Sequence, residues 1–416
     1  MDRYQKQLQW LALQRASMIE LLTKWVNINS STDNLDGLAK MLLAVIDSFQ
    51  VFGEEIEIIT LEPGTRIDSE GVLQAQHFGK ALRVIKRPEA PIQVLLCGHI
   101  DTVYPINSPF QIAKQIDDHL LVGPGATDMK GGLIIMLKAL EALEQFDGRE
   151  EIGWEVIINP DEEIGSLGST SIIRKSAKGK HIGMIFEPSF SDGFIVCERK
   201  GSTNFTIVSR GIAAHAGRDF DKGKNAITNL IKLLIKVESL NGLREGLTVN
   251  LGSIKGGGPA NIVPDLAICQ CNSRMKTSAD FEFLWESLLD FVQQENTKDG
   301  VDLQLHREGY RPPKEFDIPH QNLFEDLRDC SKELSQELHW RLSGGVCDGN
   351  ILAQEGLTTV DTLGAIGSGI HTFDETINLD SLTDRAQLCA LFLMKIASRA
   401  IDISRYQQSN TTIRKL

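Results

Sequence analysis

The spacing of apolar residues in the first half of the chain predicts helices that alternate with short strands. Apolar residues three or four positions apart predict two helices before the first strand. Residues 92–97 form an almost wholly apolar run, typical of a strand in the middle of a sheet covered on both faces. A helix over 129–144, a strand over 154–158, a helix over 170–177 and a strand over 182–186 follow. This alternation predicts parallel strands joined by right-handed crossovers.

The pattern changes after about residue 197. It becomes strand, helix, strand, strand, helix and strand, over 203–210, 222–240, 248–254, 265–274, 279–294 and 301–306. This order is typical of an open-faced α+β sandwich. Helices return over 322–337 and 348–354, followed by a strand over 358–360 and a final helix over 379–400.

The fold class predicted from these elements is α/β. We expect a mixed, largely parallel sheet with helices on both faces, plus an inserted α+β sandwich. The main domain would be discontinuous, over residues 1–198 and 312–416, and the inserted domain would occupy residues 199–311.

Composition narrows the class of protein. With 43 Lys and Arg against 56 Asp and Glu, the net charge of -13 argues against nucleic acid or an anionic membrane as the main partner. No stretch approaches the roughly 18 to 20 apolar residues that cross a bilayer, and the amphipathic start differs from a secretion signal, so we expect a cytoplasmic protein. The seven cysteines are scattered and form no C-x-x-C pair, which indicates reduced, mostly buried thiols.

Histidines and acidic residues gather just after the predicted strands, where open α/β sheets bind their ligands. These clusters span 98–103, 123–132, 160–166 and 186–188, with a fifth at 369–375. Imidazole and carboxylate ligands without cysteine suit zinc, cobalt or manganese in a catalytic site. Asp101 is placed to orient the His99 ring from its far side. Of the neighbours Glu162 and Glu163, one can bind metal while the other reaches an attacking water.

Each cluster alone is weak evidence, because a lone histidine is more often packed in a core or exposed than bound to metal. The five together favour a metal site. Gly123 and Gly125 suggest a dinucleotide fingerprint, but Asp128 stands where the third glycine belongs. The chain has no H-E-x-x-H, G-x-S-x-G or phosphate-loop motif, so serine-hydrolase and nucleotide chemistry find no support.

These motifs resemble a known family, the co-catalytic zinc peptidases and deacylases. It includes glutamate carboxypeptidase (carboxypeptidase G type), aminoacylase, acetylornithine deacetylase and succinyl-diaminopimelate desuccinylase. H-I-D-T-V, G-x-G-x-x-D-M-K-G-G, D-E-E-I-G-S and a late histidine occur in the family's order over nearly the whole chain. Residues 343–350 and the later H-T-F-D-E are most similar to the glutamate carboxypeptidase branch. The resemblance implies a metallopeptidase that hydrolyses an amide or peptide bond next to a carboxylate-bearing amino acid.

The resemblance also implies a role for each residue of a dinuclear site. Asp128 would bridge two Zn²⁺ ions, with His99 and Glu187 completing one position and Glu163 and His371 the other. Asp101 would support His99. Glu162 would be the general base, taking a proton from a water held between the metals to leave the attacking hydroxide. The Asp128–Met129 peptide bond would be cis.

Further implied roles lie outside the metal site. The inserted domain would be a lid and would join two copies as a homodimer. His215 would reach the partner subunit's active site and stabilise the oxyanion. Asn261 and Arg274 would hold the carboxylate of a small peptide or N-acyl amino acid, and Gly345 would contact this substrate through its backbone.

Three alternatives stay open at this point. The first is an N-acyl-amino-acid deacylase of the acetylornithine or succinyl-diaminopimelate type, and the second is a dipeptidase that requires a free amino group. The third is a catalytically inactive, ligand-binding homologue. A substrate panel separates all three from a carboxypeptidase.

Overall fold

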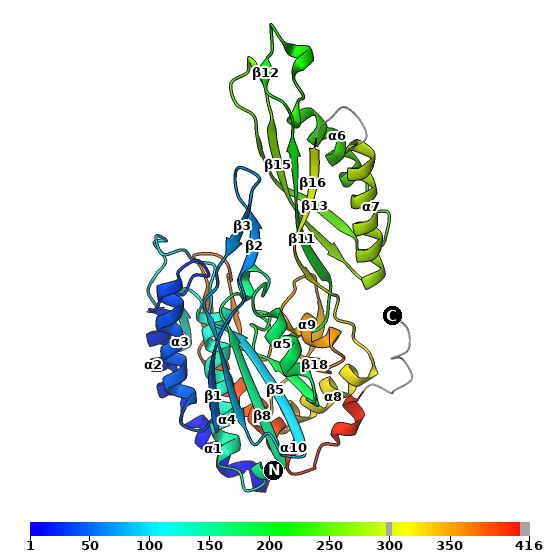
Figure 1. Ribbon diagram of the computed structural model, residues 1–416. Coiled ribbons are helices and arrows are strands. Elements are labelled where there is room, and N and C mark those ends of the chain that lie inside the picture. Colours follow the sequence, from blue (N-terminus) through cyan, green and yellow to red (C-terminus); the bar gives the residue numbers. More distant parts are fainter. Residues whose placement is uncertain (297–301, 408–416) are drawn as a thin grey trace.

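Figure 1 shows the computed structural model, which describes residues 1–296 and 302–407. Both chain ends build the larger part, around a six-stranded sheet in the order β1-β4-β8-β5-β9-β18. Strands β8, β5, β9 and β18 pair in parallel, whereas β1, β4 and β8 pair antiparallel. The strands are β1 Glu55–Thr60, β4 Lys80–Lys86, β5 Ile92–His99, β8 Ile152–Asn159, β9 Ile182–Ile185 and β18 Thr359–Val360.

Helices cover both faces of this sheet, as the apolar run in β5 predicts. Val94 and Leu96 face the larger core with α4 and α10, while Leu95 and Cys97 face a smaller core with α5 and α9. Successive strand residues point to opposite faces, so a strand buried on both must be apolar throughout. The helices of this part are α1 Gln5–Ala12, α2 Arg15–Val26, α3 Leu35–Phe49, α4 Gly132–Glu144, α5 Thr170–Ala177, α8 Ile318–Glu333, α9 Asp348–Gln354 and α10 Asp380–Ala397.

The segment 201–311, which we call the lid, forms the upper part of Figure 1. Its antiparallel sheet has the order β13-β15-β11-β16 and packs with α6 and α7 around its own apolar core. The elements follow the predicted sequence: β11 Gly201–Arg210, α6 Ala226–Glu238, β13 Thr248–Gly256, β15 Leu266–Met275, α7 Ser278–Asn296 and β16 Asp302–Arg311. The predicted fold class is thus confirmed. The domain boundaries at 198/199 and 311/312 stay a prediction, although the two main cores lie on either side of them.

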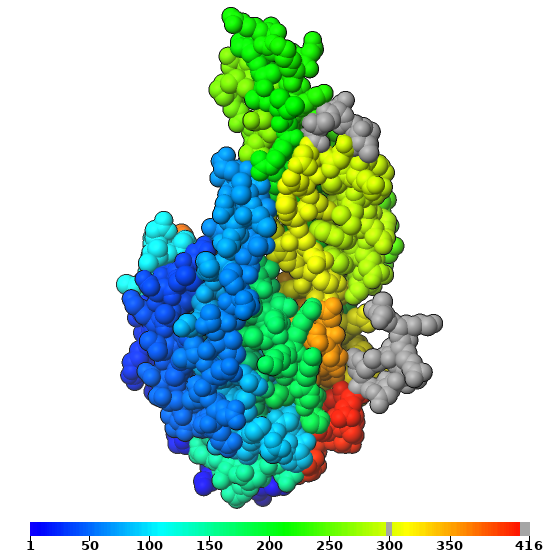
Figure 2. Space-filling model, in the orientation of Figure 1, coloured from blue at the N-terminus to red at the C-terminus, as the bar shows by residue number. Residues whose placement is uncertain are grey.

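A hairpin from the larger part reaches up to the lid, and the sequence did not predict it. It consists of β2 Gly64–Ile67 and β3 Leu73–Gln76 and lies against the lid in Figure 2. Arg210 of β11 donates a 2.8 Å hydrogen bond to the carbonyl of Gly71, and Ile67 packs with Val208 and Ile268. The hairpin therefore contacts the lid at a place separate from the two points where the chain passes between the larger part and the lid.

Some predicted boundaries are wrong. Helix α4 begins at Gly132, not at residue 129, because Asp128 and Met129 have non-helical backbone angles. Helix α8 begins and ends four residues earlier than predicted, because the Asp317 side chain caps it by accepting from His320 N. The last lid strand runs Asp302–Arg311, and residue 301 of the predicted strand lies outside the described residues.

The cysteines are as predicted, since all seven are buried and none forms a disulfide. None of the described helices has the length and apolar character needed to cross a membrane.

Candidate active site

The carboxyl ends of three neighbouring parallel strands bring the site residues together. Strand β5 ends at His99, β8 is followed by Glu162 and Glu163, and β9 by Glu187. His99 is opposite Asn159 in the β5–β8 register, so their following loops emerge side by side. The parallel arrangement therefore places these side chains in one crevice.

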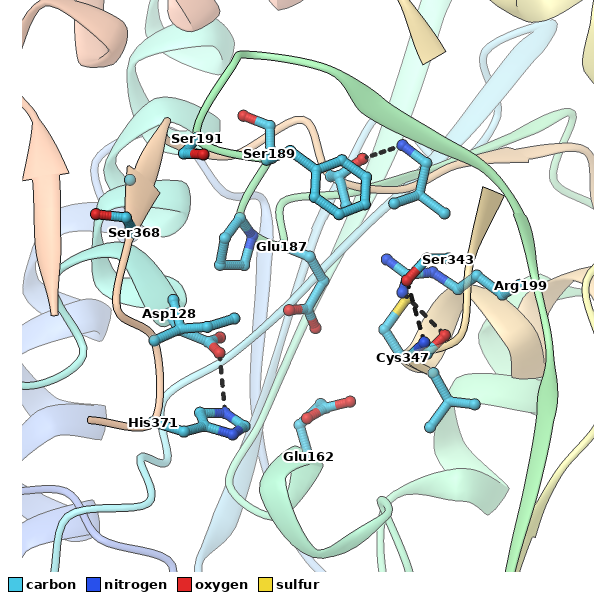
Figure 3. Close-up of a pocket in the computed structure, with 18 of the residues that line it drawn as sticks. Asp128, Glu162, Glu187, Ser189, Ser191, Arg199, Ser343, Cys347, Ser368 and His371 are labelled. Carbon is cyan, nitrogen blue, oxygen red and sulfur yellow. Dashed lines mark hydrogen bonds and ion pairs between the residues drawn. The ribbon is translucent and has the colours of Figure 1, made fainter. Parts of the chain in front are cut away.

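Asp128 enters the crevice from an irregular helical turn, η2 (Ala126–Gly131), that precedes α4. Its peptide bond to Met129 is cis, as the resemblance implied. The Asp128 carboxylate lies between two histidines, with Oδ1 3.2 Å from His99 Nε2. Its Oδ2 lies 3.3 Å from His371 Nε2 (Figure 3). It is thus placed to be shared by two cations.

The other predicted ligands complete the cluster. His371 Nε2 lies 3.2 Å from Glu163 Oε2, and His99 Nε2 lies 3.8 Å from Glu187 Oε1. Ligand atoms of His99, Asp128 and Glu163 lie within 4.8 Å of one another, and so do those of His99, Glu162 and Glu187. The structure brings together all five predicted metal ligands and the predicted base.

Two observations show that a bound cation fits this cluster. His99 Nε2 and Asp128 Oδ1 are buried and lie 3.2 Å from each other, but neither atom has a hydrogen bond, which is costly unless a further atom meets them. Burial and the repulsion of Asp128 raise the pKa of Glu163 to about 8, despite its contact with His371. Burial and the nearby Glu162 likewise raise the pKa of Glu187 well above its usual value. A cation would relieve both the repulsion and the missing contacts.

The histidines respond to the same crowding of carboxylates. Hydrogen bonds to Asp128 and Glu163 raise the pKa of His371 to about 10. Burial lowers the pKa of His99, but the carboxylates around it outweigh burial and raise the pKa well above its usual value. The raised pKa values all show that the cluster favours added positive charge, which either protons or a bound cation can supply.

Asp101 lies behind His99, where the sequence predicts a supporting residue. Its Oδ1 lies 3.2 Å from His99 Nδ1, which leaves Nε2 facing the cluster. The same carboxylate accepts hydrogen bonds from the backbone N–H groups of Glu162 and Glu163, each at 3.1 Å. Asp101 thus orients the ring and also holds the loop that carries both glutamates.

Comparison with known proteins decides the family. The model of peptidase family M20/M25/M40 matches residues 95–395. The chain belongs to this family. The resemblance drawn from the motifs is thereby confirmed, and the protein is a metal-dependent hydrolase of the peptidase type.

Individual relatives agree with this placement. Carboxypeptidase G2 from Pseudomonas sp. (strain RS-16) is 25% identical over 389 residues, covering 92% of this chain and 90% of the relative. The metallo-carboxypeptidase Sso-CP2 from Sulfolobus solfataricus has a TM-score of 0.70 at 16% identity, covering 92% of this chain and 99% of its own. The dinuclear metal-binding peptidase YXEP from Bacillus subtilis has a TM-score of 0.62 at 15% identity, with 93% and 99% covered.

Two cavities flank the ligand cluster of this M20 chain. The larger, of about 440 Å³, extends past Glu187 toward Ser189 and Ser368 (Figure 3). The smaller, of about 320 Å³, extends toward the lid residues Arg274 and Tyr310. Both are lined by Glu162, Glu163, Gly345, Val346 and His371. The predicted substrate residues Arg274 and Gly345 therefore do lie beside the cluster.

The structure does not bring His215 and Asn261 to the site of their own chain. They lie at the lid tip in and beside the pair β12 (Ala214–His215) and β14 (Ile262–Val263), at the far end of the molecule in Figure 1. Both residues are exposed, and Asn261 O accepts a 2.9 Å hydrogen bond from Ala216 N. Their predicted roles require another subunit.

Sequence reasoning missed Arg311, the last residue of β16. Its Nη1 lies 2.5 Å from Glu162 Oε1, and its Nη2 donates to Ser166 Oγ at 2.7 Å and to Asp348 Oδ1 at 3.1 Å. Arg311 precedes two prolines and is the last residue of the predicted inserted domain. An arginine at a domain boundary was the available signal.

Proposed function

We propose that this enzyme is a zinc carboxypeptidase that cleaves the amide bond on the amino side of a residue with a free carboxylate. The observation that carries this proposal is the state of Arg274. Its Nη1 is buried without a hydrogen-bond partner, and no carboxylate among the described residues forms an ion pair with it. The guanidinium is half-buried and Nε donates to Asn272 Oδ1 at 3.1 Å, so Nη1 is the buried donor left over beside the predicted metal site. Such a donor is suited to bind the carboxylate of a substrate.

The ligand set supports zinc at two positions. Imidazole and carboxylate donors suit Zn²⁺, with cobalt or manganese as substitutes. Cys347 also lines the larger cavity, but among the described residues it belongs to neither group whose ligand atoms lie close enough together to hold a cation. Asp128 would bridge the two ions, His99 and Glu187 would complete one position, and Glu163 and His371 the other.

When bound, the ions would polarise the scissile carbonyl and lower the pKa of the attacking water. Glu162 would take the water's proton and return it to the leaving amine. Burial raises the pKa of Glu162, and the charge of Arg311 opposes this rise. The Arg311 contact therefore favours the ionised form that a base requires.

The lid would supply the remaining contacts. Arg274 would bind the carboxylate in the smaller cavity, and the backbone of Gly345 would line the path between the two cavities. In a homodimer formed through the lid, His215 of the partner subunit would donate to the oxyanion and Asn261 would assist with the substrate. His215 Nδ1 accepts a 3.1 Å hydrogen bond from Gly217 N, so a neutral ring carries its proton on Nε2 and can donate it.

The larger cavity favours an N-acyl or N-blocked substrate over a dipeptide with a free amino group. Among the described residues that line this cavity, every carboxylate belongs to the ligand cluster, and Arg199 adds a positive charge. No acid is left to bind an ammonium group farther out. A cytoplasmic location stays a prediction from the sequence.

Amine release from a substrate panel tests the proposal. The panel contains N-acyl-glutamate and N-acyl-aspartate with uncharged acyl groups, the same compounds with an amidated α-carboxylate, acetylornithine, succinyl-diaminopimelate and free dipeptides. We expect the Zn²⁺-loaded enzyme to cleave the first set and the chelated enzyme to cleave none. Equal cleavage of carboxylate and amidated forms, or cleavage of only a biosynthetic acyl-amine, contradicts the carboxypeptidase assignment.

The variant Arg274→Gln provides a matched check. Hydrogen bonds to charged groups contribute about 1.5–3 kcal/mol, so its kcat/KM for the carboxylate substrate should fall about 10- to 100-fold. Activity on any amidated compound that is cleaved should change little. The same loss on both substrates contradicts a carboxylate-binding role.

A further inference from the structure

Glu375 is a fully buried carboxylate beside the ligand cluster whose partners are mostly backbone groups. Its Oε1 accepts from Thr127 N at 2.8 Å and Asp128 N at 3.0 Å. Its Oε2 accepts from Gly125 N at 2.9 Å and the Tyr104 hydroxyl at 2.7 Å. Four donors thus meet the two oxygens, and one of them is the backbone of the bridging ligand itself. Among the described residues, no lysine or arginine forms an ion pair with this carboxylate.

The same residue is tied to the segment that carries the last histidine ligand. Glu375 follows His371 by four positions in a tight turn where His371 has a φ of 63°. The Tyr104 hydroxyl that bonds Glu375 also lies 2.8 Å from Thr372 O within this turn. Glu375 O accepts from Gly123 N at 3.1 Å. The two segments, 123–128 and 369–376, are therefore joined at both the side chain and the backbone of Glu375.

We propose that Glu375 is a positioning residue that fixes the Asp128 segment relative to the His371 segment and so sets the separation of the two cation positions. Asp128 Oδ2 and His371 Nε2 are 3.3 Å apart. Among the described residues, no side chain other than Glu375 bonds both the backbone N–H of Asp128 and the Tyr104 hydroxyl, which also contacts the His371 turn. The two-cation part of this inference rests on the proposed function.

The substitution Glu375→Gln keeps the shape and changes only the pattern of donors and acceptors. The amide oxygen can still accept from Thr127 and Asp128. The amide nitrogen then faces the N–H of Gly125, so two donors meet and the buried N–H loses its acceptor. The Asp128 segment should therefore shift while the rest of the fold is kept.

Asp280→Asn is the matched control. Asp280 is a buried carboxylate in the lid that accepts from Thr277 N at 2.9 Å and from Arg244 at 3.2 Å. Its substitution removes comparable hydrogen bonds within the lid and outside the ligand cluster. It reports how much destabilisation alone affects metal binding.

Co²⁺ titration of the metal-free proteins, followed by visible absorption and metal analysis, tests the inference. Wild type and Asp280→Asn should bind two Co²⁺ ions with the same spectrum. Glu375→Gln should bind the second ion about 10- to 100-fold more weakly, as is typical when a residue supporting a metal ligand is changed, and with an altered spectrum. Wild-type affinity and spectrum in Glu375→Gln would overturn the inference while leaving the proposed function intact.

Two further outcomes are decisive. A wild-type protein that binds only one Co²⁺ overturns both the two-cation proposal and this inference. If Glu375→Gln does not fold, Tyr104→Phe carries the test, because it removes one of the four donors and should weaken the second ion several-fold. Unchanged binding in a folded Tyr104→Phe protein would then refute the positioning role.

Discussion

Arg311 Nη1 lies 2.5 Å from Glu162 Oε1, and both side chains are buried. Arg311 is the last residue of the lid sheet, whereas Glu162 follows a strand of the larger part. A charge contributed by the lid therefore touches the predicted base. The position of the lid and the ionisation of the base are linked through this contact.

Replacing Arg311 with Gln should move the pH profile. Arg311 favours ionised Glu162, so its loss raises the pKa of Glu162, and the base stays protonated up to a higher pH. The acid limb of kcat/KM should shift upward by about one pH unit or more, as is typical for loss of a close opposite charge. Arg274→Gln is the control, expected to raise KM without moving the limb. An unmoved limb in Arg311→Gln would show that this contact does not tune the base.

Glu162→Gln should remove turnover while metal stays bound. General-base catalysis contributes about 10²- to 10⁴-fold, and kcat should fall by that factor. Metal analysis after dialysis should still find the wild-type amount. Since Glu162 also lies within ligand distance of His99 and Glu187, loss of one metal equivalent would instead identify it as a ligand.

Asp361 binds one residue beside each of the two points where the chain passes between the larger part and the lid. It lies 2.9 Å from Arg199 Nη2 and 2.7 Å from Lys314 Nζ, and all three are buried. Arg199 and Lys314 also exchange two backbone hydrogen bonds of 3.0 Å. Asp361→Asn leaves two buried cations without their carboxylate and should cost about 3–5 kcal/mol in the free energy of unfolding. Urea unfolding measures this, with exposed Asp329→Asn as a control that should change little.

The same residue predicts a pH dependence of stability. Burial raises the pKa of Asp361, but Arg199 and Lys314 outweigh it and lower the pKa to about 2. Its folded pKa is thus below the unfolded value of about 3.9, so its contribution is complete above that value and is lost as the pH falls toward 2. Asp361→Asn should lose this part of the dependence. Parallel stability curves for wild type and variant between pH 4 and 2 would contradict it.

The clustering of three predicted metal ligands could be foreseen because the sequence pattern shows where the parallel strands end. His99, Glu163 and Glu187 follow three apolar strands, and such strands meet at one edge of a sheet. Asp128 and His371 needed the family motif, since each comes from an irregular segment without a periodic signal.

Arg311 and Glu375 could not be found in this way. Arg311 reaches Glu162 only because β16 pairs antiparallel with β11. This pairing places Arg311 opposite Ser202, where the chain passes between the lid and the larger part. Glu375 acts through backbone N–H groups about 250 positions earlier, which leave no trace in local periodicity. The β2–β3 hairpin was missed for a similar reason, since its exposed residues alternate weakly and are ordered by contact with the lid.

Subunit mixing tests the proposed homodimer. His215 lies exposed at the lid tip, far from the ligand cluster of its own chain, so its predicted role requires another subunit. His215→Ala and Glu162→Gln should each be nearly inactive alone. A mixed dimer regains one complete site, formed by Glu162 of the first variant and His215 of the second. Random exchange of equal amounts should restore about a quarter of wild-type activity. Mixed dimers that form, as mass spectrometry can verify, but stay inactive would refute a shared active site.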